Sequence, residues 1–270
     1  MTQRAAVALL VGLLAAELAA PTQASILGTV QVKTSTDIDV VMQVTFADSD
    51  YDRLSVYVGR QALTYQDGGL DNVYGPHHLG KGAFCIEPQP VDTTGQFNEF
   101  HIVPVDNAPS ANGPRTPDQF GAMGEVKADQ LAALWGQFYH LIDAPDADHA
   151  QYAANVLSAA FQLAVWEILW EDDRSAWDVH EGLFHAEART FTARATNLSD
   201  GDAALSLANG WLGQLDTNPG APRARLVALT HADYQDYIVQ VVPEPASLAI
   251  WSLLGAGCLA MGCRRWRTAK

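Results

Sequence analysis

Cys85 is the residue of this chain whose chemistry most needs an explanation. The sequence has three cysteines, and Cys258 and Cys263 lie in a C-terminal segment that we expect to be removed. The remaining body then has a single thiol, which cannot form an internal disulfide, the usual use of cysteine outside the cytoplasm. Three uses are left: an inert buried thiol, a reactive nucleophile, or a thiol joined to another group.

Gln162 is the second residue that could take part in chemistry. It is the single polar side chain in the apolar stretch 159–166, Ala-Ala-Phe-Gln-Leu-Ala-Val-Trp. A buried amide without hydrogen-bond partners costs roughly 1–3 kcal/mol, so Gln162 must have partners. In one interpretation it bonds the backbone of a neighbouring strand. In the other, its carboxamide carbon is bonded to the Cys85 sulfur and ammonia has been lost.

The elements that must position these two residues are strands first. Residues 26–66 alternate apolar and polar side chains with the period of strands, and Gly59-Arg60 predicts a tight hairpin before a strand over 61–65. A short strand over 83–87 carries Cys85. The apolar faces that support this reading are Ile38, Val40, Met42, Val44 and Phe46, then Leu54, Val56 and Val58.

Helical spacing follows in the middle of the chain. Apolar residues three and four apart predict a helix over 131–142, and a second helix over 152–170 is apolar nearly all round, so it should be buried. A third helix should begin at Asp202 as N-cap and run to Leu215. Residues 191–197 and 234–242 favour strands. This order predicts an α+β fold, a β-sandwich or barrel with a helical insertion.

The charge balance excludes one class of partner. The chain has 16 basic and 31 acidic residues, and residues 25–242 keep 11 of the basic and 29 of the acidic ones. A body this acidic argues against nucleic acid, because binding a phosphate backbone needs clustered Lys and Arg. We expect no cofactor.

The N-terminus is typical of a secretory signal peptide over residues 1–24. Arg4 precedes an apolar run from Ala5 to Leu14, and small residues precede a plausible cleavage site before Ser25. We therefore expect an exported body, residues 25–242.

The C-terminal segment, residues 243–270, has three parts in a fixed order. Pro243-Glu244-Pro245 comes first, then the uncharged stretch 246–263, which is long enough to span a membrane, then Arg264, Arg265 and Arg267. This order resembles the PEP-CTERM sorting signal of Gram-negative bacteria. The resemblance implies a transient inner-membrane anchor, cleavage by an exosortase, and delivery to the cell surface or the exopolysaccharide matrix.

The body resembles the thioester domains of bacterial surface adhesins. Their signature is an aromatic residue, Cys and a branched apolar residue on a strand, followed far downstream by Gln-x-Ala, an apolar residue and Trp on a helix. Phe84-Cys85-Ile86 and Gln162-Leu163-Ala164-Val165-Trp166 match it. The resemblance implies an internal Cys85–Gln162 thioester and a β-rich subdomain beside a helical one.

This chemistry is single-turnover covalent capture and not enzymatic turnover. A nucleophile such as a lysine amine on a host or matrix molecule attacks the Gln162 carbonyl, and Cys85 leaves. Trp166 and Phe84 are expected to shield the bond from water. The sequence does not choose a base among His101, His140, His149 and His185.

Several alternatives stay open at this point. The protein could be a non-reactive structural component of the exopolysaccharide matrix with the same fold, or an exported cysteine hydrolase built on Cys85 and a histidine. His77-His78 and the acidic stretches 143–148 and 171–173 lack the ligand spacing of zinc or calcium sites, so we expect no metal.

Overall fold

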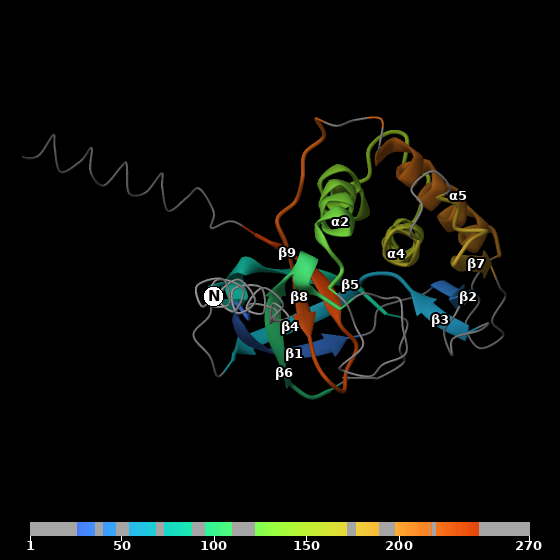
Figure 1. Ribbon diagram of the computed structural model, residues 1–270. Helices are drawn as coiled ribbons and strands as arrows, with labels where there is room; N and C mark the ends of the chain where they lie inside the picture. Colours follow the sequence, from blue (N-terminus) through green and yellow to red (C-terminus); the bar gives the residue numbers. More distant parts are fainter. Residues whose placement is uncertain are drawn as a thin grey trace, which may run out of the picture.

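The computed structural model describes residues 26–35, 40–46, 54–68, 73–87, 95–109, 122–171, 177–188, 198–215, 217 and 220–242. In these residues the chain forms a closed antiparallel barrel, a three-stranded sheet, and a group of helices that covers both. Figure 1 shows the helices on one side of the molecule, with the barrel below α2 and the small sheet below α4 and α5. The predicted α+β class is confirmed, and its β part is a barrel with a separate three-stranded sheet.

The barrel has the strand order β1-β4-β5-β9-β8-β6. Its walls are antiparallel throughout, and each strand has buried apolar residues that fill the interior. The strands are β1 (Gly28–Ser35), β4 (Gln61–Asp67), β5 (Leu79–Cys85), β6 (Asn98–Pro104), β8 (Leu226–Thr230) and β9 (Tyr237–Val241). An open sheet of this size would have two edge strands with unpaired backbone groups. Closure into a barrel pairs those two strands with each other.

The second sheet has the order β3-β2-β7, with β2 (Val40–Phe46) in the centre between β3 (Leu54–Val58) and β7 (Phe184–Ala188). The predicted apolar face of β2 is confirmed, because Val40, Met42, Val44 and Phe46 are all buried. The Gly59-Arg60 hairpin is wrong. β3 pairs with β2 and β4 pairs with β1 and β5, so the chain crosses at Gly59-Arg60 from the small sheet into the barrel.

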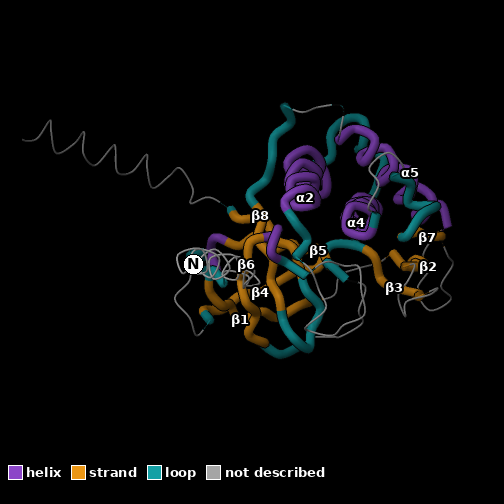
Figure 2. Tube along the Cα trace, viewed as in Figure 1, coloured by secondary structure: helices purple, strands orange, loops and turns teal. Residues whose placement is uncertain are grey.

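The helices form the insertion between barrel strands β6 and β8. They are α2 (Glu125–Phe138), α3 (His140–Asp143), α4 (Ala154–Trp170) and α5 (Leu198–Leu215); short 3-10 turns η1 (Pro76–His78) and η2 (Val105–Asn107) lie in the barrel loops. Figure 2 shows α4 enclosed by α2, α5 and the strands. Every residue of α4 from Val156 to Trp170 is buried, which confirms the expectation drawn from its apolar sequence. Asp202 is not an N-cap, because α5 begins four residues earlier, at Leu198.

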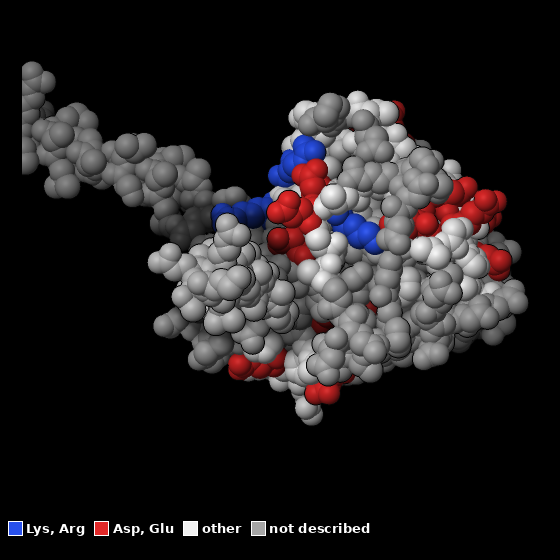
Figure 3. All heavy atoms as spheres, in the orientation of Figure 1, with Lys and Arg blue, Asp and Glu red and all other residues white. Residues whose placement is uncertain are grey.

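The predicted signal peptide (1–24), the sorting tail (243–270) and the expected strand over 191–197 lie outside the described residues. Within the described ranges, no helix combines the length and the apolar character that crossing a membrane requires. On the face drawn in Figure 3, acidic side chains gather at the end of the molecule that carries α5 and β7, in keeping with the acidic composition of the body.

Candidate functional site

Cys85 lies at the last position of barrel strand β5, which packs against α4. It is opposite Tyr237 of β9, and the chain stays paired for one more residue because the Ile86 N–H donates to the Asp236 carbonyl at 3.0 Å. This pairing fixes the main chain on both sides of the thiol. The position of Cys85 is therefore set by the barrel and not by a mobile loop.

Gln162 lies at the middle of α4, in a turn of the helix that packs against the end of β5. Its carboxamide makes two hydrogen bonds to the main chain of Cys85. The Cys85 N–H donates to Oε1 at 2.8 Å, and Nε2 donates to the Cys85 carbonyl oxygen at 2.9 Å. Two residues that are 77 positions apart in the sequence are thus held together by both ends of one amide.

Both groups are shielded from solvent. Gln162 is 1% exposed and Cys85 is 5% exposed. Burial raises the pKa of the Cys85 thiol, and the nearby negative charge of Glu87 raises it further, whereas a hydrogen bond with the Gln61 side chain lowers it. The thiol is therefore largely protonated at neutral pH, and its reaction as a nucleophile requires removal of that proton.

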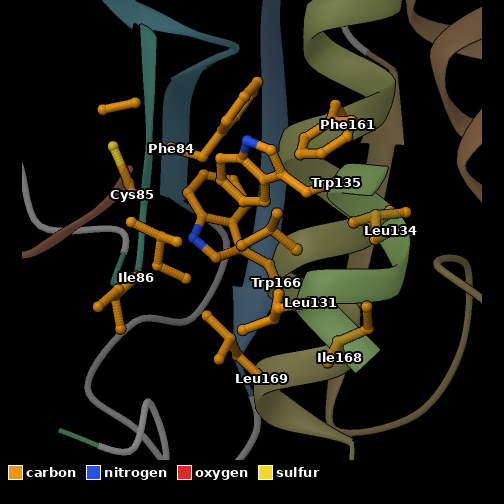
Figure 4. Packing of buried hydrophobic residues seen from close by; sticks show 14 of the residues in the cluster. Phe84, Cys85, Ile86, Leu131, Leu134, Trp135, Phe161, Trp166, Ile168 and Leu169 are labelled. Atoms are coloured by element: carbon orange, nitrogen blue, oxygen red, sulfur yellow. The ribbon is translucent and has the colours of Figure 1, made fainter. Parts of the chain in front are cut away.

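Aromatic rings pack on the helix side of the site. The Phe84 ring contacts those of Phe161, with centroids 4.6 Å apart, and Trp135, with centroids 5.3 Å apart. Figure 4 shows the three rings converging between β5 and α4, while the sulfur of Cys85 lies on the opposite side of its strand. Side chains alternate between the faces of a strand, so Phe84 and Ile86 face the helices and Cys85 faces away from them.

Close contact between β5 and its neighbours depends on a glycine. A Cβ on Gly82 would lie 2.5 Å from the Tyr139 hydroxyl and 2.5 Å from Cδ of Arg60. Arg60 in turn pairs with Asp143 at 2.7 Å, and its N–H donates at 2.5 Å to Oγ of Ser158, one helical turn before Gln162. These contacts tie the start of β4 to α3 and α4 beside the site.

Trp166, one turn after Gln162, is 1% exposed. Its ring packs edge-on against Phe46 of β2, with centroids 5.7 Å apart, and lies 6.0 Å from Phe184 of β7. In Figure 4 the indole extends from α4 towards the strand that carries Cys85 and Ile86. Its ring contacts are with Phe46 and Phe184 of the three-stranded sheet, so its role as a shield of the Cys85–Gln162 pair stays a prediction.

Glu87 is a residue of the site that the sequence reasoning missed. It is 8% exposed, and its Oε1 accepts the Asp236 N–H at 3.1 Å. Its main-chain carbonyl accepts a hydrogen bond from the Gln235 side chain. The signal was present in the sequence, since Glu87 is a carboxylate only two residues after Cys85.

The four histidines considered as bases lie in other places. His101 is on β6, His140 opens α3, and His185 is on β7 opposite Thr45. His149 bonds Asp146 through Nδ1 at 2.6 Å and accepts from the Trp211 indole at 3.3 Å. Glu87, and none of these histidines, is the charged group that shifts the pKa of the Cys85 thiol.

The other residues singled out from the sequence are not brought to this site. The rings of His77 and His78 lie 4.0 Å apart in η1. In the part of the chain that the structure describes, no group of three or more His, Cys, Asp or Glu side chains is arranged to hold a metal ion. Pro243, Glu244, Pro245, Arg264, Arg265 and Arg267 lie outside the described residues.

The arrangement has two features that acyl transfer at Gln162 would use. The Cys85 N–H already donates to the amide oxygen, which polarises the carbonyl and would stabilise negative charge on that oxygen in a tetrahedral intermediate. The surrounding apolar rings exclude water, the competing nucleophile. The two hydrogen bonds hold the main chain of Cys85 against this carboxamide. The bond to sulfur would form once the Cys85 side chain turned from the far side of its strand towards Gln162.

Comparison with known proteins gives one structural match. No protein-family model matches the sequence, and no curated protein matches it. Among solved structures, the chain is similar to the N-terminal domain of the Streptococcus pyogenes pilus tip adhesin Cpa, with 13% sequence identity and a TM-score of 0.36. The match covers 78% of this chain and 98% of that domain.

Proposed function

We propose that this protein is an exported surface or matrix protein that captures a nucleophile covalently through a Cys85–Gln162 thioester. The observation that carries the proposal is the double hydrogen bond between the Gln162 carboxamide and the Cys85 main chain, in a site with almost no exposure. A single cysteine or a single buried glutamine, taken alone, has many explanations. Contact between the two across 77 residues of sequence favours a function in which both residues take part.

The proposed bond forms once, by attack of the Cys85 sulfur on the Gln162 carbonyl carbon with release of ammonia. Capture follows the same path, because an amine of the target attacks that carbon and the sulfur leaves. The product is an amide between Gln162 and the target. Each protein molecule reacts once, so the protein is not a turnover enzyme.

The partners follow from the two ends of the chain and from the chemistry of the bond. An exosortase would cut near Pro243-Glu244-Pro245 and free the body from the inner membrane. The body would then meet amines at the cell surface or in the exopolysaccharide matrix, for adhesion or for cross-linking the matrix. The acidic character of the body favours targets that carry lysines.

A second candidate is a non-reactive structural protein of the matrix with the same fold. It is favoured by the same contact, because the two hydrogen bonds to Cys85 satisfy both groups of the Gln162 amide. A satisfied amide of this kind holds a strand end to a helix without any covalent bond.

The intact mass of the purified protein separates the two candidates. Covalent capture requires a mass that is one ammonia below the value calculated from the sequence, and loss of this difference in both Cys85→Ala and Gln162→Glu. Gln214→Glu, an exposed change on α5, is the matched control and should keep the deficit. A full sequence mass for the wild-type protein would favour the structural candidate.

A further inference from the structure

Glu87 lies two residues after Cys85, in the bend that follows the last residue of β5. Its carboxylate accepts the N–H of Asp236, the chain neighbour of Tyr237, and Tyr237 is the strand partner of Cys85. The carboxylate is therefore bound to the segment that runs opposite Cys85. Its negative charge also raises the pKa of the Cys85 thiol.

The position of Glu87 is fixed by the segment that precedes β9. The Asp236 N–H donates to Oε1 of Glu87 at 3.1 Å, and the Asp236 carbonyl accepts the Ile86 N–H at 3.0 Å. Asp236 is itself held, because its Oδ1 accepts the His231 N–H at 2.8 Å. A carboxylate that is 8% exposed and tied at this position is pre-organised beside the thiol.

From this geometry we infer that Glu87 is the proton acceptor and donor of the Cys85–Gln162 reaction. The inference rests on the proposed function. A base is needed within the buried site because a protonated thiol is a poor nucleophile.

One carboxylate is sufficient for the proton transfers of both bond formation and capture. During bond formation Glu87 takes the proton from Sγ, the sulfur forms its bond to Cδ of Gln162, and the C–N bond breaks. Glu87 then returns the proton to the departing nitrogen, which leaves as ammonia. During capture, the amine of the target bonds to Cδ and loses a proton to Glu87, the S–C bond breaks, and Glu87 returns the proton to the Cys85 sulfur.

The test compares Glu87→Gln with Glu99→Gln, an exposed glutamate on β6 that undergoes the same change of charge. Glu87→Gln keeps an oxygen that can accept the Asp236 N–H. The measurements are the intact mass and the rate of methylamine incorporation, expressed per concentration of uncharged amine. We expect Glu87→Gln either to retain the full sequence mass or to incorporate methylamine about 100-fold more slowly, since general acid–base catalysis contributes about 10²–10⁴-fold. Glu99→Gln should behave as wild type, and Glu87→Asp should recover part of the rate.

The outcomes separate this inference from the proposed function. If the wild-type protein has lost ammonia and Glu87→Gln reacts at the wild-type rate, the role of Glu87 is wrong while the thioester stands. If the wild-type protein has its full mass, both fail. Should Glu87→Gln not fold, the wild-type pH profile decides. A normalised rate that levels off once one carboxylate is ionised supports the inference, whereas a rate that keeps rising tenfold per pH unit overturns it.

Discussion

Phe84 and Phe161 immediately precede Cys85 and Gln162 in the sequence, and their rings pack against each other with centroids 4.6 Å apart. Each ring is fully buried. Cys85 and Gln162 are therefore held together by their neighbours as well as by the hydrogen bonds of the Gln162 amide. This contact joins β5 to α4 at the site, and it provides a way to loosen the pair without touching either residue.

Phe161→Ala should lower the free energy of unfolding by about 3–5 kcal/mol, the usual cost of truncating a buried aromatic ring. It should also speed loss of any Cys85–Gln162 bond to water, because the cavity opens beside the amide. Denaturant unfolding and intact mass over time measure the two effects. Tyr57→Ala, at a ring that is 51% exposed on β3, is the control and should change stability by less than about 0.5 kcal/mol.

Trp166→Ala should cost about 3–5 kcal/mol and yield poorly soluble protein. The indole packs on Phe46 and near Phe184, so its removal opens a cavity between α4 and the three-stranded sheet. Thermal unfolding measures the effect. Val126→Ala, at an exposed position on α2, is the comparison, and an equal melting temperature in both variants would contradict the packing described.

Glu167 should make the protein less stable as the pH rises through neutrality. The side chain is fully buried on α4, Oε1 accepts the Asp178 N–H at 2.8 Å, and Oε2 is buried without a hydrogen-bond partner. Burial raises the pKa of Glu167 from its ordinary 4.5 to about 8, and the charges of Glu171 and Asp178 add to the rise.

Between about pH 4.5 and pH 8, Glu167 of the folded protein keeps a proton that the same residue has lost in the unfolded chain. The contribution of Glu167 to stability is therefore greatest below about pH 4.5 and falls by on the order of a few kcal/mol up to about pH 8. Glu167→Gln, which is always neutral, should remove this decline. Urea unfolding at several pH values tests it, and parallel profiles for the two proteins would count against a protonated Glu167.

The helices were easier to predict than the barrel. The apolar sequence of α4 predicts a buried helix by itself, and the alternation of β2 predicts its buried face. The partners of the strands are not encoded locally. Gly59-Arg60 looks like a hairpin because glycine precedes a new strand, yet the tertiary contacts send β3 and β4 to different sheets. Strands β6, β7 and β8 have only five to seven residues, and runs this short do not distinguish a strand from other structure by their pattern.

The Cys85–Gln162 pair was predicted through resemblance and not through spacing. The 76 residues between them do not predict that α4 packs against the end of β5, because that contact depends on how the insertion folds back onto the barrel. Glu87 is predictable as a candidate base, since it is a carboxylate two residues after Cys85 and carboxylates as well as histidines act as general bases.

Processing at both ends can be checked by peptide mapping of the extracellular protein from its native host. We expect the mature chain to begin near Ser25 and to end near Pro243–Pro245, so that Cys258 and Cys263 are absent. Recovery of peptides from residues 255–270 in the extracellular form would contradict cleavage by an exosortase.

Methylamine treatment of the native protein tests covalent capture most directly. We expect the starting protein to lack one ammonia and to show no free thiol, and treatment to add methylamine at Gln162 and release the Cys85 thiol. Gln162→Ala should expose the thiol from the start, Cys85→Ala should have its full mass, and neither should incorporate the amine. A starting mass equal to the sequence mass, with no adduct on Gln162 after treatment, would contradict the thioester.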